Sequence, residues 1–212
     1  MQRPPSASVQ PSESLSRIGV MGGSFDPIHL GHLIMAEAAR EALNLNLVLF
    51  VPTAVQPLKQ DRLAADPTHR AAMIEIAIEE NPCFRLSRVD LDRPGPSYTV
   101  DTLRLLDDEY TQASFWFVLG ADALQSLPRW RDPQGILALT RLAVVRRPDA
   151  ALDLADLIRV FPRLDEAVDW VDAPLIDISS TNLRRRAAEG ESLRYRTPDA
   201  VRDYIESHGL YR

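Results

Sequence analysis

Cysteine, lysine and long apolar runs are scarce in this chain of 212 residues. The single cysteine, Cys83, excludes a disulfide framework and a metal site built from several cysteines, and it favours the cytoplasm as the compartment. No apolar run approaches the roughly 20 residues that a membrane-spanning helix needs, and residues 1–16 lack the apolar segment of a secretory signal. We therefore expect a cytoplasmic protein with no membrane partner.

Positively charged residues are also fewer than negatively charged residues. The 24 Lys and Arg residues are outnumbered by 30 Asp and Glu residues, and Lys59 is the only lysine. The formal net charge of −6 argues against a nucleic-acid partner, because surfaces that bind nucleic acid are basic. Small anionic ligands are still compatible with this charge, since they respond to the local field.

What the chain does contain is a regular alternation of elements. Residues 1–16 are rich in Pro and Ser and predict a disordered N-terminal tail, whereas residues 17–212 predict a single domain. The predicted strands are 18–21, 47–51, 84–91, 115–119, 142–146 and 175–178, and the predicted helices are 32–43, 67–80, 99–110, 152–160, 180–189 and 197–208. This pattern predicts an α/β fold with a doubly wound parallel sheet, in which ligands bind outside the carboxyl ends of the strands.

The segment that leaves the first predicted strand has the features of a phosphate-binding turn; it runs Gly22-Gly23-Ser24-Phe25-Asp26-Pro27-Ile28-His29-Leu30-Gly31-His32. Paired glycines allow a ligand to approach the backbone closely, and the start of a helix offers N–H groups and a positive dipole end. His29 and His32 are three residues apart and share one face of that helix. Such a pair is also half of a metal site, although no third His or Cys is close in sequence to complete one.

This string resembles the HxGH signature of the nucleotidyltransferase superfamily, whose strand, turn and helix are also similar to those of class I aminoacyl-tRNA synthetases. The second signature of the superfamily, ISSTxxR, is matched by residues 178–184. Four further motifs lie between them: Gly95-Pro96-Ser97-Tyr98-Thr99, Gly120-Ala121-Asp122, Leu127-Pro128-Arg129-Trp130 and Arg147-Pro148. In this order the motifs resemble the bacterial nicotinate-nucleotide adenylyltransferases over essentially residues 17–212.

The resemblance implies a Rossmann-like nucleotidyltransferase fold and a reaction of NAD biosynthesis. The adenylyl group of ATP would pass to nicotinate mononucleotide, giving nicotinate adenine dinucleotide and pyrophosphate. The attacking group is a phosphate monoester with a second pKa of ~6, so it is ionised at neutral pH and needs no general base. Catalysis should then consist of positioning and of neutralising charge on the phosphoryl oxygens.

For ATP, the resemblance implies that His29, His32 and Arg184 are catalytic. The residues implied to bind ATP are Gly22, Gly23, Ser24, Phe25, His29, His32, Lys59, Asp122, Ser180, Thr181 and Arg184. Ser180 and Thr181 open a predicted helix and suit the β- and γ-phosphates, although taken alone they also fit an ordinary helix cap. Mg²⁺ is expected to accompany ATP and to bind mainly water and substrate oxygens, so no protein ligand for a metal is named.

For nicotinate mononucleotide, the implied residues are Ser97, Tyr98, Thr99 and Trp130. The helix that starts after Tyr98 would present N–H groups to the carboxylate, and Trp130 would stack on the pyridine ring, although a tryptophan here also fits a core or rim position. One departure concerns the Pro-Pro-His-Lys segment of the family, which here is Gln56-Pro57-Leu58-Lys59. Leu58 replaces the histidine, which puts a ligand role at that position in doubt.

Two alternatives stay open at this point. One is another HxGH enzyme such as phosphopantetheine adenylyltransferase, whose chains are usually shorter and lack the Gly-Pro-Ser-Tyr-Thr and Leu-Pro-x-Trp segments. The other is a non-catalytic module that binds adenine nucleotides. It would need the glycines, but it would not need both histidines, Arg184 and an acceptor pocket. The oligomeric state is also open, a homo-oligomer included.

Overall fold

The computed structural model describes residues 16–55, 64–146, 154–174 and 176–212, and the structural statements below concern these residues. The predicted tail apart from Ser16, the Leu58-Lys59 pair and the Arg147-Pro148 motif lie outside the described residues. Within the described ranges, none of the helices combines the length and the apolar character needed to cross a bilayer.

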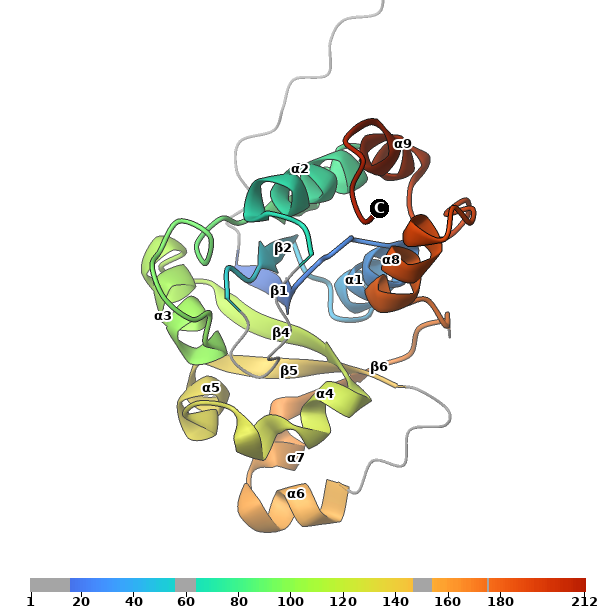
Figure 1. Ribbon diagram of the computed structural model, residues 1–212. Coiled ribbons are helices and arrows are strands. Elements are labelled where there is room, and N and C mark those ends of the chain that lie inside the picture. The colour runs from blue at the N-terminus through green and yellow to red at the C-terminus, as the bar shows by residue number, and fades with distance from the viewer. Residues whose placement is uncertain (1–15, 56–63, 147–153, 175) are drawn as a thin grey trace, which may run out of the picture.

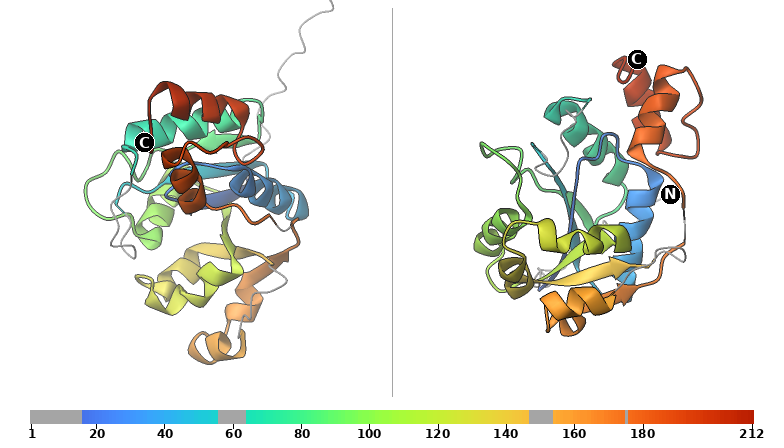
Figure 2. Two further views of the ribbon diagram at one scale, coloured as in Figure 1. Left: turned by 45° about the vertical axis from the view of Figure 1, so that its right-hand side comes forward. Right: turned by 60° about the horizontal axis from the view of Figure 1, so that its bottom comes forward.

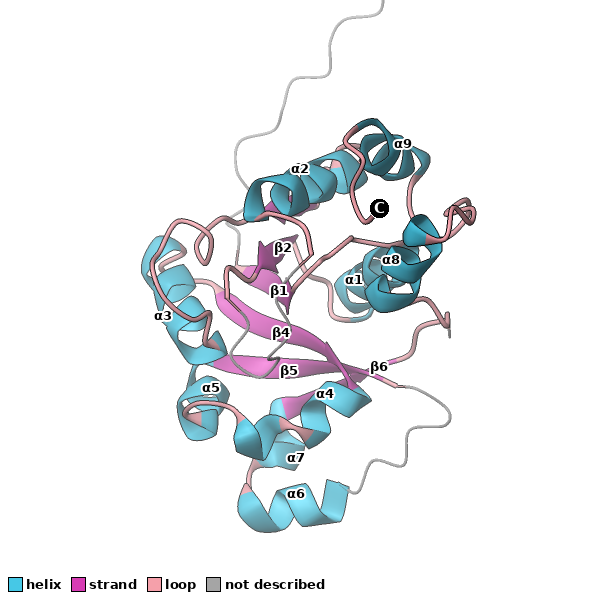
Figure 3. Ribbon diagram, viewed as in Figure 1, coloured by secondary structure: helices cyan, strands magenta, loops and turns pink. Residues whose placement is uncertain are grey.

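The centre of the fold is a parallel sheet with the strand order β3-β2-β1-β4-β5-β6 (Figures 1 and 3). Its strands are β1 (Arg17–Gly23), β2 (Leu47–Pro52), β3 (Phe84–Leu86), β4 (Ser114–Gly120), β5 (Thr140–Val145) and β6 (Val168–Val171). All neighbouring strands pair in parallel, and Val20 in β1 lies opposite Leu49 in β2 and Phe117 in β4. The order reverses between β1 and β4, which is the topological switch point of a doubly wound sheet.

Helices cover both faces of the sheet (Figure 2). They are α1 (Leu30–Ala42), α2 (Pro67–Ile78), α3 (Thr99–Glu109), α4 (Ala121–Gln125), α5 (Pro133–Leu139), α6 (Leu154–Val160), α7 (Leu164–Ala167), α8 (Ser180–Ala188) and α9 (Asp199–Ser207), with a 3-10 turn over Leu127–Arg129. Helices α3 to α7 contribute to one buried apolar cluster, and α1, α2, α8 and α9 contribute to the other. The predicted α/β fold with a doubly wound parallel sheet is therefore confirmed.

The two clusters explain why the strands are apolar throughout. Successive side chains of a strand point to opposite faces. In β4, Phe115 and Phe117 belong to the cluster under α3, whereas Trp116 and Val118 belong to the cluster under α1. Because both faces are covered, alternation of polar and apolar residues is lost, as expected for a parallel sheet.

The structure corrects the edges of the predicted sheet. The strand predicted over 175–178 is wrong, because residues 176–179 form no strand and the edge strand is β6. The apolar residues Ile176 and Ile178 lie in the loop that enters α8, and Ile178 packs on the second cluster from there. The strand predicted over 84–91 is too long, since β3 ends at Leu86 and the chain then turns at 88–92.

Candidate active site

The turn between β1 and α1 is anchored through four of its backbone carbonyls. Each accepts a hydrogen bond from a side chain that is distant in sequence: Arg70 Nη1 to Ser24 O at 2.7 Å, Arg184 Nη1 to Asp26 O at 2.8 Å, Ser180 Oγ to Pro27 O at 2.8 Å and Thr197 Oγ1 to Ile28 O at 2.9 Å. The elements α2, α8 and the segment before α9 thus hold the turn from three directions. This anchoring fixes the position of the two histidines that end it.

His29 and His32 stack on each other at the first turn of α1. Their ring centroids are 3.7 Å apart and their planes are inclined by 22°. His32 Nδ1 accepts the backbone N–H of His29 at 3.2 Å, so the proton of a neutral His32 lies on Nε2. Gly31 leaves room for the stack, because a Cβ at this position would lie 3.1 Å from the His29 ring.

Both imidazoles are uncharged at neutral pH. Burial lowers the pKa of His29 to about 4, and burial followed by the proximity of His29 lowers the pKa of His32 well below its usual value. Buried Phe25 packs edge-on against His32, with 5.0 Å between the ring centroids. His29 Nδ1 is buried and has no hydrogen-bond partner in the described part of the chain, which is unusual unless a ligand completes the site.

A cavity of about 520 Å³ lies beside His32, at the carboxyl ends of β1 and β4. Gly22 and Gly23 line it from β1, and Leu119 and Gly120 line it from β4. Its volume falls within the range of about 300–1,000 Å³ that is typical of small-molecule sites. Its place at the topological switch point is where open α/β sheets bind ligands.

The opposite wall of this cavity carries a rigidly held aromatic ring. Trp130 follows the 3-10 turn, and its indole Nε1 donates to Ser126 Oγ at 2.8 Å. The ring also meets Phe117 of β4 edge-on at 5.8 Å between centroids. The Trp130 ring is therefore fixed in orientation where it lines the cavity.

The residue after Trp130 brings a positive charge to the cavity. Arg131 lines the cavity, and its guanidinium lies over the Tyr98 ring with Cζ 4.6 Å from the ring centroid. Its Nη1 is 3.5 Å from Asp101 Oδ2 in the first turn of α3. These two contacts hold the exposed Arg131 side chain at the cavity.

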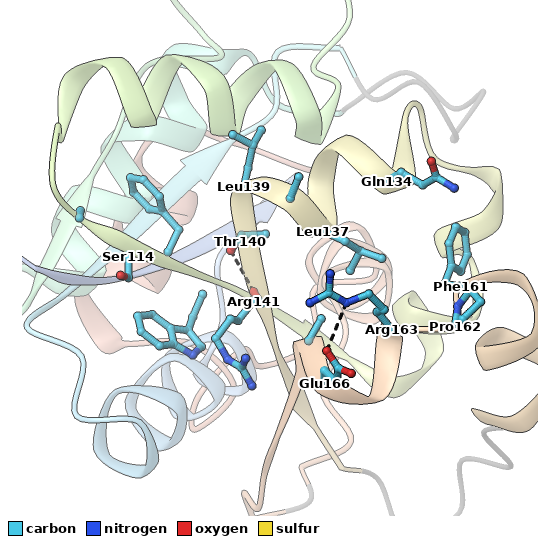
Figure 4. Close-up of a pocket in the computed structure, with 15 residues that line it drawn as sticks. Ser114, Gln134, Leu137, Leu139, Thr140, Arg141, Phe161, Pro162, Arg163 and Glu166 are labelled. Carbon is cyan, nitrogen blue, oxygen red and sulfur yellow. Dashed lines mark hydrogen bonds and ion pairs between the residues drawn. The ribbon is translucent and has the colours of Figure 1, made fainter.

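A larger cavity of about 840 Å³ lies at the opposite, amino-terminal ends of strands β4 and β5 (Figure 4). It is lined by the amino-terminal residues of β4 and β5, including Ser114 and Thr140, and by residues of α5 and of the segment 161–167. Charged side chains around it are paired, Arg163 with Glu166 at 3.2 Å among them. No predicted site residue lines it, and ligands of parallel sheets bind at the carboxyl ends of the strands. We therefore assign the candidate site to the smaller cavity.

Comparisons with known proteins show the family of this chain. The cytidylyltransferase-like family model matches residues 20–186. A protein from Roseiflexus sp. (strain RS-1), named "Probable nicotinate-nucleotide adenylyltransferase", is 52% identical over 94% of this chain and 100% of its own length. A protein of the same name from Thermomicrobium roseum is 46% identical over 93% of this chain and 92% of its own. The chain belongs to the nicotinate-nucleotide adenylyltransferase family.

The fold agrees with this membership. The solved structure described as Plasmodium falciparum nicotinic acid mononucleotide adenylyltransferase complexed with NaAD is similar with a TM-score of 0.77. The two chains are 20% identical, and the similarity covers 92% of this chain and 97% of that one. The nucleotidyltransferase fold that the motifs predicted is therefore confirmed.

Most of the residues predicted for the family's substrates meet at one place. Those that line the cavity are Gly22, Gly23, His32, Ser97, Tyr98, Thr99, Asp122 and Trp130. His29 stacks on His32, while Ser180 and Arg184 reach the turn from α8. Thr181 is exposed and lies 3.4 Å from Arg184 Nη2.

Two residues predicted to bind ATP have another role in the structure, and one lies outside it. Phe25 is buried in the second apolar cluster and supports His32. Ser24 presents its carbonyl to Arg70, and its side chain does not line the cavity. Lys59 lies outside the described residues.

Sequence reasoning missed several residues of the site. Those at the cavity or the turn are Asp26 as a buried acceptor, Arg70, Asp90, Thr102, Arg131 and Tyr211. Asp90 is 3% exposed and accepts hydrogen bonds from Arg93 and Thr102 within the cavity wall. Arg131 adjoins Trp130, which was a usable signal, whereas no pattern in the sequence marks the others.

Proposed function

We propose that this chain transfers the adenylyl group of ATP to nicotinate mononucleotide, with the histidine pair at the ATP phosphates and the neighbouring cavity holding the acceptor. The observation that carries the proposal is the pair of stacked, uncharged histidines at the edge of a cavity at the switch point of the sheet. Family membership fixes the reaction that this arrangement serves.

The chemistry requires positioning more than proton transfer. A phosphate oxygen of nicotinate mononucleotide forms a bond to the α-phosphorus, and the bond from that phosphorus to the oxygen bridging to the β-phosphate breaks. The acceptor phosphate has a second pKa of ~6 and is ionised at neutral pH, so no base removes a proton. His32 contributes its Nε2–H as a donor to the phosphoryl oxygens, where negative charge increases during transfer.

Helix α8 takes part by holding the turn and by presenting its first turn to the triphosphate. Ser180 and Arg184 anchor the turn through Pro27 and Asp26, and the α8 N-terminus with Thr181 is the proposed contact for the β- and γ-phosphates. The planar guanidinium of Arg184 is the proposed donor to the same oxygens, and the ammonium group of a lysine would not replace it fully.

We propose that Mg²⁺ enters the site together with ATP. No group of three or more His, Cys, Asp or Glu side chains in the described ranges is arranged to hold a metal ion. The groups around the turn are instead N–H and O–H donors, which bind phosphate oxygens. This donor set fits a nucleotide whose own oxygens and water would hold the ion, which would supply positive charge to the triphosphate.

The acceptor half of the site supports the acid over the amide. A carboxylate on the pyridine ring would face the start of α3 at Tyr98-Thr99 and the guanidinium of Arg131, with Trp130 against the ring. An amide would turn an NH₂ group toward these donors and leave them unsatisfied, at about 1–3 kcal/mol per group. This wall is the proposed source of selectivity for nicotinate mononucleotide.

Pyrophosphate release tests the proposal. The purified protein is incubated with ATP and Mg²⁺, together with nicotinate mononucleotide, 4′-phosphopantetheine or no acceptor. Of these three reactions, we expect pyrophosphate only in the one that contains nicotinate mononucleotide. Sedimentation of the same preparation gives its oligomeric state. Release with 4′-phosphopantetheine would assign the chain to the other HxGH enzymes. Binding of ATP without release of pyrophosphate under any condition would leave only a nucleotide-binding module.

Retention in a cytoplasmic fraction of the source cell tests the compartment that the single cysteine favours.

A further inference from the structure

The end of the chain reaches the turn that carries the histidine pair. The Tyr211 hydroxyl donates to Asp26 Oδ1 at 2.7 Å, which joins residues 185 positions apart. Figure 1 shows the C-terminal end close to α2 and α9, on the side of the sheet where the turn leaves β1. Tyr211 does not line the cavity, and Asp26 is the residue to which its hydroxyl donates.

Asp26 is a buried junction of the turn. Its carboxylate is 1% exposed and also accepts the backbone N–H groups of Ala64 at 2.8 Å and Ala65 at 3.1 Å. Its backbone carbonyl accepts Arg184 Nη1 from α8. A shift of the Asp26 side chain therefore moves a backbone segment that lies three residues before His29.

The charge of this carboxylate is balanced by a buried cation. Arg70 is fully buried, donates to Ser24 O from the other side of the turn and has an electrostatic interaction with Asp26. Arg70 Nη2 has no hydrogen-bond partner in the described ranges, so this buried cation already lacks part of its hydrogen bonding. Buried charges keep their place only while their hydrogen bonds are made.

The Tyr211 hydroxyl is a dependable donor. Burial, and then the negative charge of Asp26, raise the pKa of Tyr211 far above its usual value, so the hydroxyl keeps its proton at every working pH. Replacing Tyr211 by Phe retains the ring and removes one donor from the carboxylate. Of its donors in the described residues, the carboxylate then keeps only the N–H groups of Ala64 and Ala65, and a buried charge with fewer donors is held less firmly in its position.

We propose that Tyr211 is a positioning residue for ATP: its hydroxyl, acting through Asp26, fixes the turn that presents His29 and His32 to the phosphates. The inference rests on the proposed function, in which this turn binds the triphosphate. It makes Tyr211 a part of the active-site support, although this residue lies outside the cavity.

The test compares Tyr211→Phe with Tyr195→Phe, a control at a tyrosine that is 86% exposed. For Tyr211→Phe we expect the KM for ATP to rise about tenfold, which corresponds to about 1.4 kcal/mol. The KM for nicotinate mononucleotide should stay within about twofold, because the acceptor wall is untouched. In an Asp26→Ala background the same substitution should add little, since Asp26→Ala has already removed the acceptor of the Tyr211 hydroxyl.

Each result decides between the explanations. Partial misfolding lowers the active fraction and therefore kcat, and leaves both KM values in place, so it does not imitate the expected outcome. Unchanged KM values for Tyr211→Phe, equal increases for both substrates, or additive effects with Asp26→Ala would each overturn the inference. If the unmodified protein released no pyrophosphate, the proposed function itself would fail, which is distinct from an active enzyme that tolerates Tyr211→Phe.

Discussion

Burial of His29 makes the ligand-free protein sensitive to mild acid, and the size of this effect follows from its pKa. The usual value is 6.5, and burial lowers the pKa in the folded protein to about 4. Between these two values the unfolded chain binds a proton that the folded protein does not bind. The contribution of His29 to the free energy of unfolding is therefore fully retained above pH 6.5 and is lost as the pH falls toward 4.

The loss of unfolding free energy at pH 5 follows from comparing how strongly His29 binds a proton in the unfolded and in the folded state. With pKa values of 6.5 and about 4, the unfolded state is favoured about 30-fold relative to neutral pH, or by about 2 kcal/mol. The pKa of His32 is lowered as well, so His32 acts in the same direction. A loss of this size is large beside the 5–15 kcal/mol that separates typical folded and unfolded proteins.

Denaturant unfolding of the ligand-free protein at about pH 7.5 and pH 5 measures the effect. His29→Asn should lose about 2 kcal/mol less than the unmodified protein between the two pH values, because Asn does not titrate. His208→Asn, an exposed histidine just after α9, is the matched control and should behave as the unmodified protein does. Equal losses in His29→Asn and the unmodified protein would refute the idea that burial holds His29 uncharged.

Three further predictions concern the site. His32→Ala should lower kcat by a factor of about 10²–10³, as loss of one donor to a transition state typically does, while His208→Ala changes it little; steady-state kinetics decide, and a kcat within about threefold of normal contradicts the role. Gly31→Ala should weaken ATP binding in calorimetric titrations, because its Cβ would lie 3.1 Å from the His29 ring; unchanged affinity would show that the stack is dispensable. The kcat/KM ratio of nicotinate to nicotinamide mononucleotide should be about 10²–10⁴ and should fall in Arg131→Ala; comparable values for both substrates would contradict acid selectivity.

The sheet could be predicted from the sequence where its strands are long and apolar on both faces. Strands β1, β2, β4 and β5 are of this kind, and the predicted ends differ from those in the structure by at most two residues. The edge strand β6 was missed because Val168–Val171 is short and contains Asp169 and Trp170, whose side chains are only partly buried. An edge position removes the continuous apolar signal on which the prediction depended.

The site could be predicted only as far as its residues are contiguous. The turn and the start of α8 are single strings, so their glycines, histidines and hydroxyl groups stood out together. The supporting contacts are not contiguous: Arg70 is 46 residues from Ser24 and Tyr211 is 185 residues from Asp26. Such contacts arise from tertiary packing, and neither spacing nor periodicity records them.

The buried histidines also bear on why a phosphate site would use uncharged donors. An imidazolium binds a triphosphate strongly in the ground state and binds released pyrophosphate strongly as well. Binding that is equally strong before and during reaction does not raise kcat. A neutral Nε2–H gives up part of that ground-state attraction, and its hydrogen bond strengthens as negative charge increases on the phosphoryl oxygens. In the proposed reaction, the apolar support that Phe25 gives to His32, together with the burial of His29, would thus direct binding energy toward the transition state of adenylyl transfer.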